Sequence, residues 1–180
     1  MDAVRKILVT GASGYVGGRL VTALLEDGAS VRVFVRDQKK AQSNSWASSV
    51  EIATGNASDY QSTLKALTGI HTAYYLLHSI NAGTNFDKIE SEMATNFAKA
   101  SEEAGVKQII YLGGINNDLK SSKHLNSRAN TGRSLASTSV PVMEMRAGII
   151  IGSGSASFEM LRHLTHRLPV MTTPKWVMNK

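Results

Sequence analysis

The residues from Thr10 to Gly17 have the types and the spacing to bind a pyrophosphate. They read Thr-Gly-Ala-Ser-Gly-Tyr-Val-Gly, which places glycines at positions 11, 14 and 17. Gly11 would let the chain turn sharply out of a strand, Gly14 would let the backbone approach a phosphate group, and Gly17 would let the next helix pack close to the sheet. The pattern predicts a dinucleotide-binding loop, with a tight structural turn as the alternative.

The segments on either side of these glycines supply the strand and the helix that such a loop requires. Residues 5–10 form a short apolar run, which is typical of a buried strand. After the loop, apolar side chains recur at helical spacing as far as Gly28, where the helix is expected to end. The N-terminus of a helix favours anions because its first N–H groups have no partner within the helix. We expect Ser13, Tyr15 and Val16 to contact the ligand together with the glycines.

An arginine, rather than an acid, follows the second predicted strand. A carboxylate at this point would bind the ribose diol of NAD and repel a 2′-phosphate. The Arg36 guanidinium can instead bind a 2′-phosphate through paired charged hydrogen bonds. Lys39 and Lys40 add positive charge nearby, and Ser13 can add a hydroxyl group. We therefore favour NADP(H) over NAD(H) as the cofactor. In the alternative, Arg36 is a solvated charge and Asp37 binds the ribose.

Strand-like segments alternate with helical segments along the chain. The predicted strands cover residues 5–10, 31–35, 50–53, 72–77, 108–112 and 142–146, and a long helix runs from residue 89 to about residue 105. Strands separated by helices form a parallel sheet with right-handed crossovers. We expect an α/β fold with a doubly wound parallel sheet, the Rossmann fold, in the strand order 3-2-1-4-5-6. The polar stretch 116–130 is expected to form a loop over the site.

Four segments of the chain carry a family resemblance. The first is the Gly-x-x-Gly-x-x-Gly spacing at 11–17, and the second is Ala-Tyr-Tyr-Leu-Leu-His at 73–78. The third is the helix and strand at 96–113, and the fourth is Arg-Ala-Gly-Ile-Ile-Ile-Gly-Ser-Gly-Ser-Ala-Ser at 146–157. Together they resemble the extended and atypical branches of the short-chain dehydrogenase/reductase superfamily. Within these branches, which include epimerase/dehydratase-like proteins, the chain looks most like NmrA-like, NAD(P)H-binding members.

This resemblance implies cofactor contacts after the third and the fourth strand. The family lays the adenine after the third strand, where this chain has Asn56 and Ala57. The nicotinamide ribose of the family lies at the end of the fourth strand, where this chain has Leu77 and His78. For His78, a hydrogen-bonding role is preferred to proton transfer.

The resemblance also implies how the chain divides. We expect an NAD(P)-binding Rossmann domain over residues 1–155 and the start of a smaller C-terminal substrate lobe over residues 156–180. The apolar residues Trp176 and Val177 have nothing after them to bury them. We therefore expect the lobe to be truncated here.

The catalytic residues of active relatives are missing from this sequence. Those relatives use a Tyr-x-x-x-Lys pair, in which the lysine lowers the tyrosine pKa for proton exchange, and a serine at the end of the fifth strand. No tyrosine here has a lysine four residues later, and Gly113-Gly114 stands in place of the serine. His124 and Arg128 keep the spacing of a proton donor and a cation. We favour the alternative that these two residues have no catalytic role.

Two functions stay open on this basis. One is an NAD(P)H-dependent oxidoreductase of atypical mechanism, acting on a small molecule such as a quinone or a flavin-like ring that needs no proton from the enzyme. The other is a non-catalytic NAD(P) sensor that signals to a regulatory protein partner.

The composition argues against several other classes. The chain has no cysteine, so disulfides and thiolate metal sites are excluded, and no metal site is predicted. Its apolar runs are far shorter than the roughly 20 residues that span a bilayer, and its N-terminus leaves no room for a signal peptide, so we expect a cytoplasmic protein. The net charge of +6 is concentrated after residue 119. Because those basic residues are scattered without interleaved aromatic residues, nucleic acid is not an expected partner.

Overall fold

Neighbouring residues of the central strand point to opposite faces of a parallel sheet. In β1 (Lys6–Thr10), Leu8 and Val9 are fully buried in two separate apolar cores, one on each face. The computed structural model describes residues 5–78, 86–115, 123–148, 150–168 and 170. The other strands are β2 (Ser30–Val35), β3 (Glu51–Thr54), β4 (Thr72–Tyr75), β5 (Gln108–Gly114) and β6 (Val142–Ala147). All pairs are parallel and the order is β3-β2-β1-β4-β5-β6, which confirms the predicted doubly wound α/β fold.

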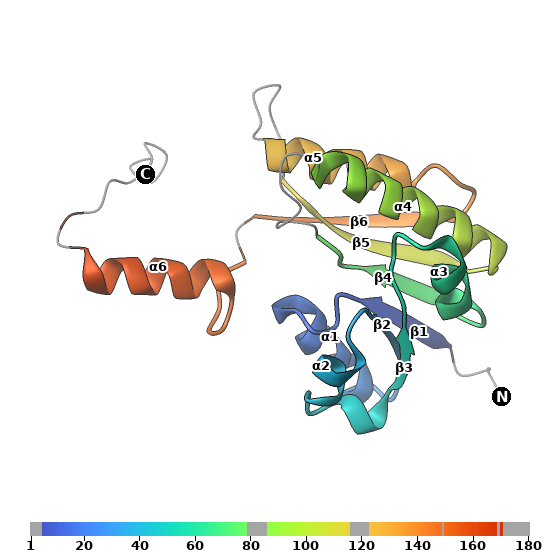
Figure 1. Ribbon diagram of the computed structural model, residues 1–180, viewed down its shortest axis with the longest axis horizontal. Helices are drawn as coiled ribbons and strands as arrows, with labels where there is room; N and C mark the ends of the chain where they lie inside the picture. Colours follow the sequence, from blue (N-terminus) through green and yellow to red (C-terminus); the bar gives the residue numbers. More distant parts are fainter. Residues whose placement is uncertain (1–4, 79–85, 116–122, 149, 169, 171–180) are drawn as a thin grey trace. The chain divides into compact units, whose positions relative to one another are not determined.

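Helices cover both faces of this sheet (Figure 1). The larger core lies beneath α3 (Tyr60–Leu67), α4 (Phe86–Glu103) and α5 (Lys123–Leu135). The smaller core lies beneath α1 (Tyr15–Glu26), α2 (Gln38–Gln42) and the 3-10 helix η1 (Ala47–Ser49). Because all strands run in the same direction, their carboxyl ends meet at one edge of the sheet. In doubly wound folds this edge binds ligands.

The helix α5 corrects one expectation from the sequence. Residues 116–130 were expected to form a loop, but α5 begins at Lys123, so the expectation is wrong from that residue onward. The buried face of α5 contains the small polar residues Ser127 and Thr131 beside Leu135. Such a face lacks the apolar periodicity from which amphipathic helices are predicted.

The chain separates into two units, residues 1–147 and residues 148–180. In the second unit, α6 (Ala156–Arg167) begins after Ser155, whose hydroxyl oxygen accepts a hydrogen bond from the Phe158 N–H at 3.3 Å. Met160 and Leu161 of this helix are exposed. In the part of the chain that the structure describes, no helix is both long enough and apolar enough to cross a membrane.

Candidate functional site

Backbone contacts that leave no room for side chains shape the loop between β1 and α1. Gly11 has a φ of +65°, a left-handed conformation that favours glycine. Its carbonyl oxygen accepts a hydrogen bond from the Gly14 N–H at 2.9 Å. A Cβ atom at Gly17 would lie only 2.2 Å from the same oxygen. The sharp turn and the close packing of α1 thus both require glycine.

The N-terminus of α1 fits an anionic ligand. The helix begins after Gly14, and among the described residues no side chain forms a capping hydrogen bond there and no acid stands in the first turn. The first N–H groups of a helix have no partner within it, and its dipole favours negative charge. The side chain of Tyr15 lies beneath the Arg19 guanidinium, 3.9 Å from the ring centroid, and so does not cap the helix. These residues suit a pyrophosphate.

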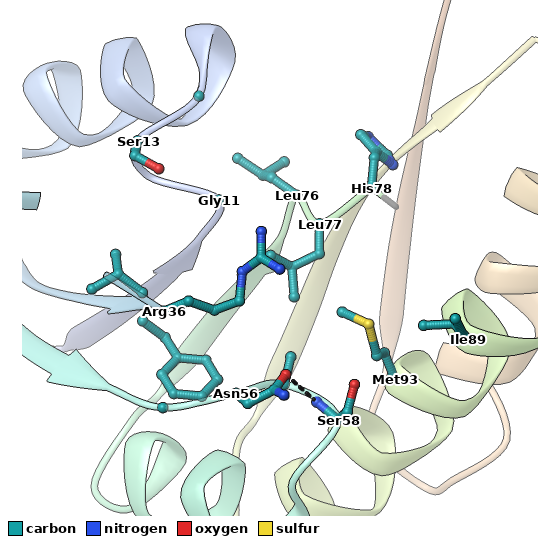
Figure 2. Close-up of a pocket in the computed structure, with 15 residues that line it drawn as sticks. Gly11, Ser13, Arg36, Asn56, Ser58, Leu76, Leu77, His78, Ile89 and Met93 are labelled. Atoms are coloured by element: carbon teal, nitrogen blue, oxygen red, sulfur yellow. Dashed lines mark hydrogen bonds between the residues drawn. The ribbon is translucent and has the colours of Figure 1, made fainter. Parts of the chain in front are cut away.

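A cavity of about 600 Å³ opens beside this loop. Figure 2 shows its walls, with the glycine loop beside Leu76 on one wall, Asn56 and Ser58 on a second, and Ile89 and Met93 of α4 on a third. It is lined by Gly11, Ser13, Gly14, Phe34, Val35, Arg36, Gly55, Asn56, Ala57, Ser58, Leu76, Leu77, His78, Ile89 and Met93. A site of this kind, concave and partly apolar with a few polar groups, is typical for a small-molecule ligand.

The structure brings together most of the residues that the sequence predicted for the cofactor. Those that line the cavity are Gly11, Ser13, Gly14, Arg36, Asn56, Ala57, Leu77 and His78. Tyr15, Val16 and Gly17 lie in the first turn of α1 and do not line it. The remaining lining residues were not predicted from the sequence. Two of these, Ile89 and Met93, stand one helical turn apart on α4, which is the only signal that could have placed them on one wall.

Arg36 reaches into the cavity from the end of β2. Figure 2 shows its guanidinium group between the glycine loop and Leu77. The next residue, Asp37, is the N-cap of α2, and its carboxylate accepts a hydrogen bond from the Lys40 N–H at 3.1 Å. After β2, therefore, Arg36 lines the cavity, whereas the carboxylate of Asp37 stabilises the start of α2.

Hydrogen bonds fix the cavity wall that follows β3. The Asn56 side-chain oxygen accepts a hydrogen bond from the Ser58 N–H at 3.1 Å, and its carbonyl oxygen accepts one from the Ser62 hydroxyl at 2.9 Å. The Asn96 amide of α4 donates to the Ser58 carbonyl oxygen at 3.1 Å. The loop is thus tied to α3 and α4 and does not depend on a ligand for its shape.

A buried threonine fixes the cavity wall that follows β4. The Thr10 hydroxyl donates to the Tyr74 carbonyl oxygen at 3.0 Å and accepts from the Leu76 N–H at 2.9 Å. It joins the end of β1 to the residues that leave β4. Leu77 and His78 follow directly, so their position depends on this bridge.

His78 meets a residue that is distant in the sequence. The Arg128 guanidinium lies 3.3 Å from the His78 Nε2 atom. An imidazole that accepts this bond is neutral and carries its proton on Nδ1. Part of the residue stays accessible to solvent, yet the surrounding side chains remove enough water from the ring, and Arg128 adds enough repulsion, to lower the pKa of His78 to about 4. His78 is therefore a neutral hydrogen-bonding group at physiological pH.

The comparison with known sequences identifies the family. The profile of the NmrA-like family matches residues 4–153. The chain belongs to the NmrA-like family. This confirms the predicted place among atypical short-chain dehydrogenase/reductase proteins, whose Rossmann-type fold it shares.

Several characterised proteins are similar to this NmrA-like chain. Sterol demethylase protein B of Methylococcus capsulatus is 32% identical over 128 residues, which cover 65% of this chain and 38% of that protein. Ceramide reductase of Caulobacter vibrioides is 25% identical over 173 residues, which cover 94% of this chain and 54% of that protein. The chain thus spans about half, or less, of the length of these relatives.

A solved structure of similar fold is triphenylmethane reductase of Citrobacter sp. It is 25% identical and superimposes with a TM-score of 0.73, covering 89% of this chain and 54% of the reductase. The same reductase has been solved in complex with NADP(H). The structural similarity therefore covers nearly all of this NmrA-like chain, but only about half of the reductase.

Proton chemistry by tyrosine has no support at this site. Tyr75 and Tyr111 are fully buried beneath α4 and α5, and neither lines the cavity. Burial raises the pKa of Tyr111 to about 12 and the pKa of Tyr75 further still. The side chain of His124, the residue that the sequence offered as a candidate for a proton donor, lies outside the described part of the chain.

A metal site has no support either. Within the described residues, no three His, Cys, Asp or Glu side chains lie close enough to hold a metal ion.

A carboxylate occupies the space beside Gly113, the position at which the family resemblance led us to look for a serine. A Cβ atom at Gly113 would lie 2.6 Å from the Glu144 Oε1 atom and 3.2 Å from the Tyr111 ring. The Glu144 carboxylate is itself paired with Arg146 at 3.1 Å. The sheet thus has no room for the missing serine while Glu144 keeps this position.

We expect Gly113→Ser to be energetically coupled to Glu144. The added side chain must displace the carboxylate, so the change should destabilise the protein more in the presence of Glu144 than in a Glu144→Ala background. Residues in contact couple by about 0.5–3 kcal/mol, and the low end is expected because Glu144 can rotate toward solvent. Urea unfolding of the four proteins of this double-mutant cycle measures the coupling. If Gly113→Ser lowers the free energy of unfolding equally in both backgrounds, Glu144 does not fill the space beside Gly113.

Proposed function

We propose that the chain binds NADP(H) in the cavity described above, with the pyrophosphate on the loop at Gly11 and Gly14 and the 2′-phosphate at Arg36. The observation that carries the proposal is the Arg36 guanidinium inside the cavity, while Asp37 is engaged as a helix cap. A guanidinium matches a phosphate with two parallel charged hydrogen bonds. The NADP(H) complex of the similar triphenylmethane reductase supports the same cofactor.

We propose further that the protein is an oxidoreductase whose acceptor needs no proton from a tyrosine. A dihydronicotinamide supplies a hydride when bound. Beyond that, the chain offers neutral His78 in the cavity wall and charged Arg128 beside it, and among the described residues no tyrosine lines the cavity. Quinones and cationic dyes accept a hydride without prior protonation. The names of the curated relatives add a sterol and a ceramide to the classes of molecule that deserve testing.

The division of the chain follows from the same proposal. Residues 1–155 would form the NAD(P)-binding domain, and residues 156–180 would begin a substrate lobe. The relatives, which are longer than this chain, support a substrate lobe of larger size.

We expect the protein to oxidise NADPH when a suitable acceptor is added. A panel of acceptors would contain quinones, a triphenylmethane dye, a ketosteroid and simple aldehydes, with the loss of NADPH absorbance as the measure. Quinones or the dye should react at least tenfold faster than the aldehydes, because an aldehyde needs a proton donor and general acids contribute about 10²–10⁴-fold.

The controls separate binding from catalysis. NADPH fluorescence titration without an acceptor measures cofactor affinity alone. Tight NADPH binding without turnover of any acceptor would contradict the oxidoreductase and favour a sensor that signals to a partner protein. Absence of NADPH binding would contradict both.

A further inference from the structure

Two hydrogen bonds, one partly buried and one buried, fix α5 against the sheet and against α4. The Tyr111 hydroxyl of β5 donates to the Arg128 carbonyl oxygen at 3.0 Å. The hydroxyl of the neighbouring Ser127, which is only 2% exposed, donates to the Glu90 carboxylate of α4 at 2.6 Å. The backbone at Arg128 is therefore held from two sides, and its side chain has a defined starting point.

From this anchored backbone the Arg128 side chain reaches the end of β4. Its guanidinium meets the neutral His78 ring at 3.3 Å, and His78 lines the cavity. Among the described residues, no carboxylate forms an ion pair with Arg128. A positive charge whose hydrogen-bond partner is neutral thus stands beside the His78 end of the cavity, and the Glu90 carboxylate is close enough to act on the same His78 ring. Such a charge can stabilise an anion that forms within its reach.

We propose that Arg128, oriented by His78, binds the oxygen of the hydride acceptor and stabilises the negative charge that develops on it. The inference rests on the proposed function and names the group that acts on the acceptor. It departs from the sequence-based preference for no catalytic role, and it does so for Arg128 alone. Arg128 would be the catalytic residue and His78 a positioning residue.

The chemistry of arginine defines the class of acceptor. Hydride transfer to a quinone leaves oxidised nicotinamide and a hydroquinone monoanion, which then takes one proton from solvent. A guanidinium donates hydrogen bonds and carries a permanent charge, but it has no proton to give away. His78, neutral and poorly basic, does not store a proton either. The site therefore suits quinones and conjugated carbonyls whose reduced oxyanions are stable in water.

This role can be tested with two acceptors, of which only one becomes an anion when it is reduced. Reduction of a quinone creates an oxyanion, whereas reduction of a cationic triphenylmethane dye removes a positive charge and creates none. Arg128→Gln should lower kcat for the quinone by about 100-fold, as expected for the loss of one oxyanion donor. The dye should react at the same rate or faster. The matched control is Arg133→Gln, which removes an exposed arginine from the same helix and should change neither rate.

A binding measurement tests the same charge without turnover. The probe is 4-nitrophenol, whose phenolate mimics the hydroquinone monoanion and absorbs in the visible range. A cation within about 4–6 Å lowers the pKa of a bound acid by about 1–3. The pKa of 4-nitrophenol bound to the protein with NADP⁺ should therefore be lower in the original protein and in Arg128→Lys than in Arg128→Gln.

Each alternative gives a different result. A fold defect would slow quinone and dye alike, and a cofactor contact would weaken NADPH binding in the fluorescence titration; either result would overturn the proposed role. Failure of 4-nitrophenol to bind, or an equal pKa in the original protein and Arg128→Gln, would overturn it as well. If no acceptor is reduced but the pKa difference is present, the oxyanion site stands and the proposed reaction fails.

Discussion

Gly17→Ala is expected to lower the affinity for NADPH by more than about 100-fold. The new Cβ atom would lie 2.2 Å from the Gly11 carbonyl oxygen and 2.9 Å from the Ala12 Cα atom. Both are backbone atoms, so relief requires that the loop and α1 move apart. The phosphate contacts of the loop depend on N–H groups at fixed positions, and each charged hydrogen bond contributes about 1.5–3 kcal/mol. Loss of two such bonds gives the expected effect. Fluorescence titration of NADPH measures it.

The adjacent glycine provides the matched control. A Cβ atom at Gly18 would lie 3.4 Å from the Ala12 carbonyl oxygen and 3.7 Å from the Trp46 indole nitrogen, which are ordinary contact distances. Gly18→Ala adds the same atom to the same helix and should leave NADPH affinity within about twofold. Thermal unfolding of both variants reports whether the fold persists. Equal NADPH affinities in the two variants would contradict the role of Gly17 in shaping the loop.

A second substitution separates the ligand site from the packing of α1. A Cβ atom at Gly14 would meet only the Gly11 carbonyl oxygen, at 3.2 Å, and Gly14 lines the cavity. The branched side chain of Gly14→Val would therefore enter the ligand space with little effect on the protein core. Gly14→Val should therefore have nearly the original unfolding temperature but a lower affinity for NADPH. Gly17→Ala should lower both the affinity for NADPH and the unfolding temperature.

The sequence predicted the sheet and the glycine loop because both are local features. A buried strand, the glycine spacing and an amphipathic helix lie within residues 5–28, and each has its own signal in the chain. The strand order followed from the alternation of strands and helices. The same reasoning placed Arg36 and His78 at strand ends, which meet at one edge of a parallel sheet.

The α5 side of the site could not be predicted in this way. The buried face of α5 is fixed by hydrogen bonds from small polar residues, such as Ser127 to Glu90, and not by an apolar stripe. Polar residues of this kind are typical of loops when only the sequence is known. The contact between His78 and Arg128 joins residues 50 positions apart. Likewise, only the pairing of β5 with β6 shows that Glu144 lies beside Gly113.

In the proposed function, the choice between the two dinucleotides depends on one side chain. If Arg36 binds the 2′-phosphate, Arg36→Ala should weaken NADPH binding by roughly 10- to 150-fold, because a charged hydrogen bond is worth about 1.5–3 kcal/mol. The affinity for NADH, which has no such phosphate, should change by less than about threefold. Parallel titrations with both cofactors measure the ratio. The ratio is informative because any general damage to the cavity weakens both cofactors equally.

A neighbouring lysine tests whether overall positive charge, rather than Arg36, sets this preference. Lys39 lies on α2 close to Arg36, is exposed and does not line the cavity. Lys39→Ala removes one positive charge, as Arg36→Ala does, but should lower NADPH affinity only a fewfold, and high salt should erase the difference because screening acts on exposed charges. Tighter binding of NADH than NADPH by the original protein would refute the preference for NADP(H). In that case Asp37 would have to leave its capping bond to Lys40 to reach the ribose, and Asp37→Asn would be expected to weaken NADH binding.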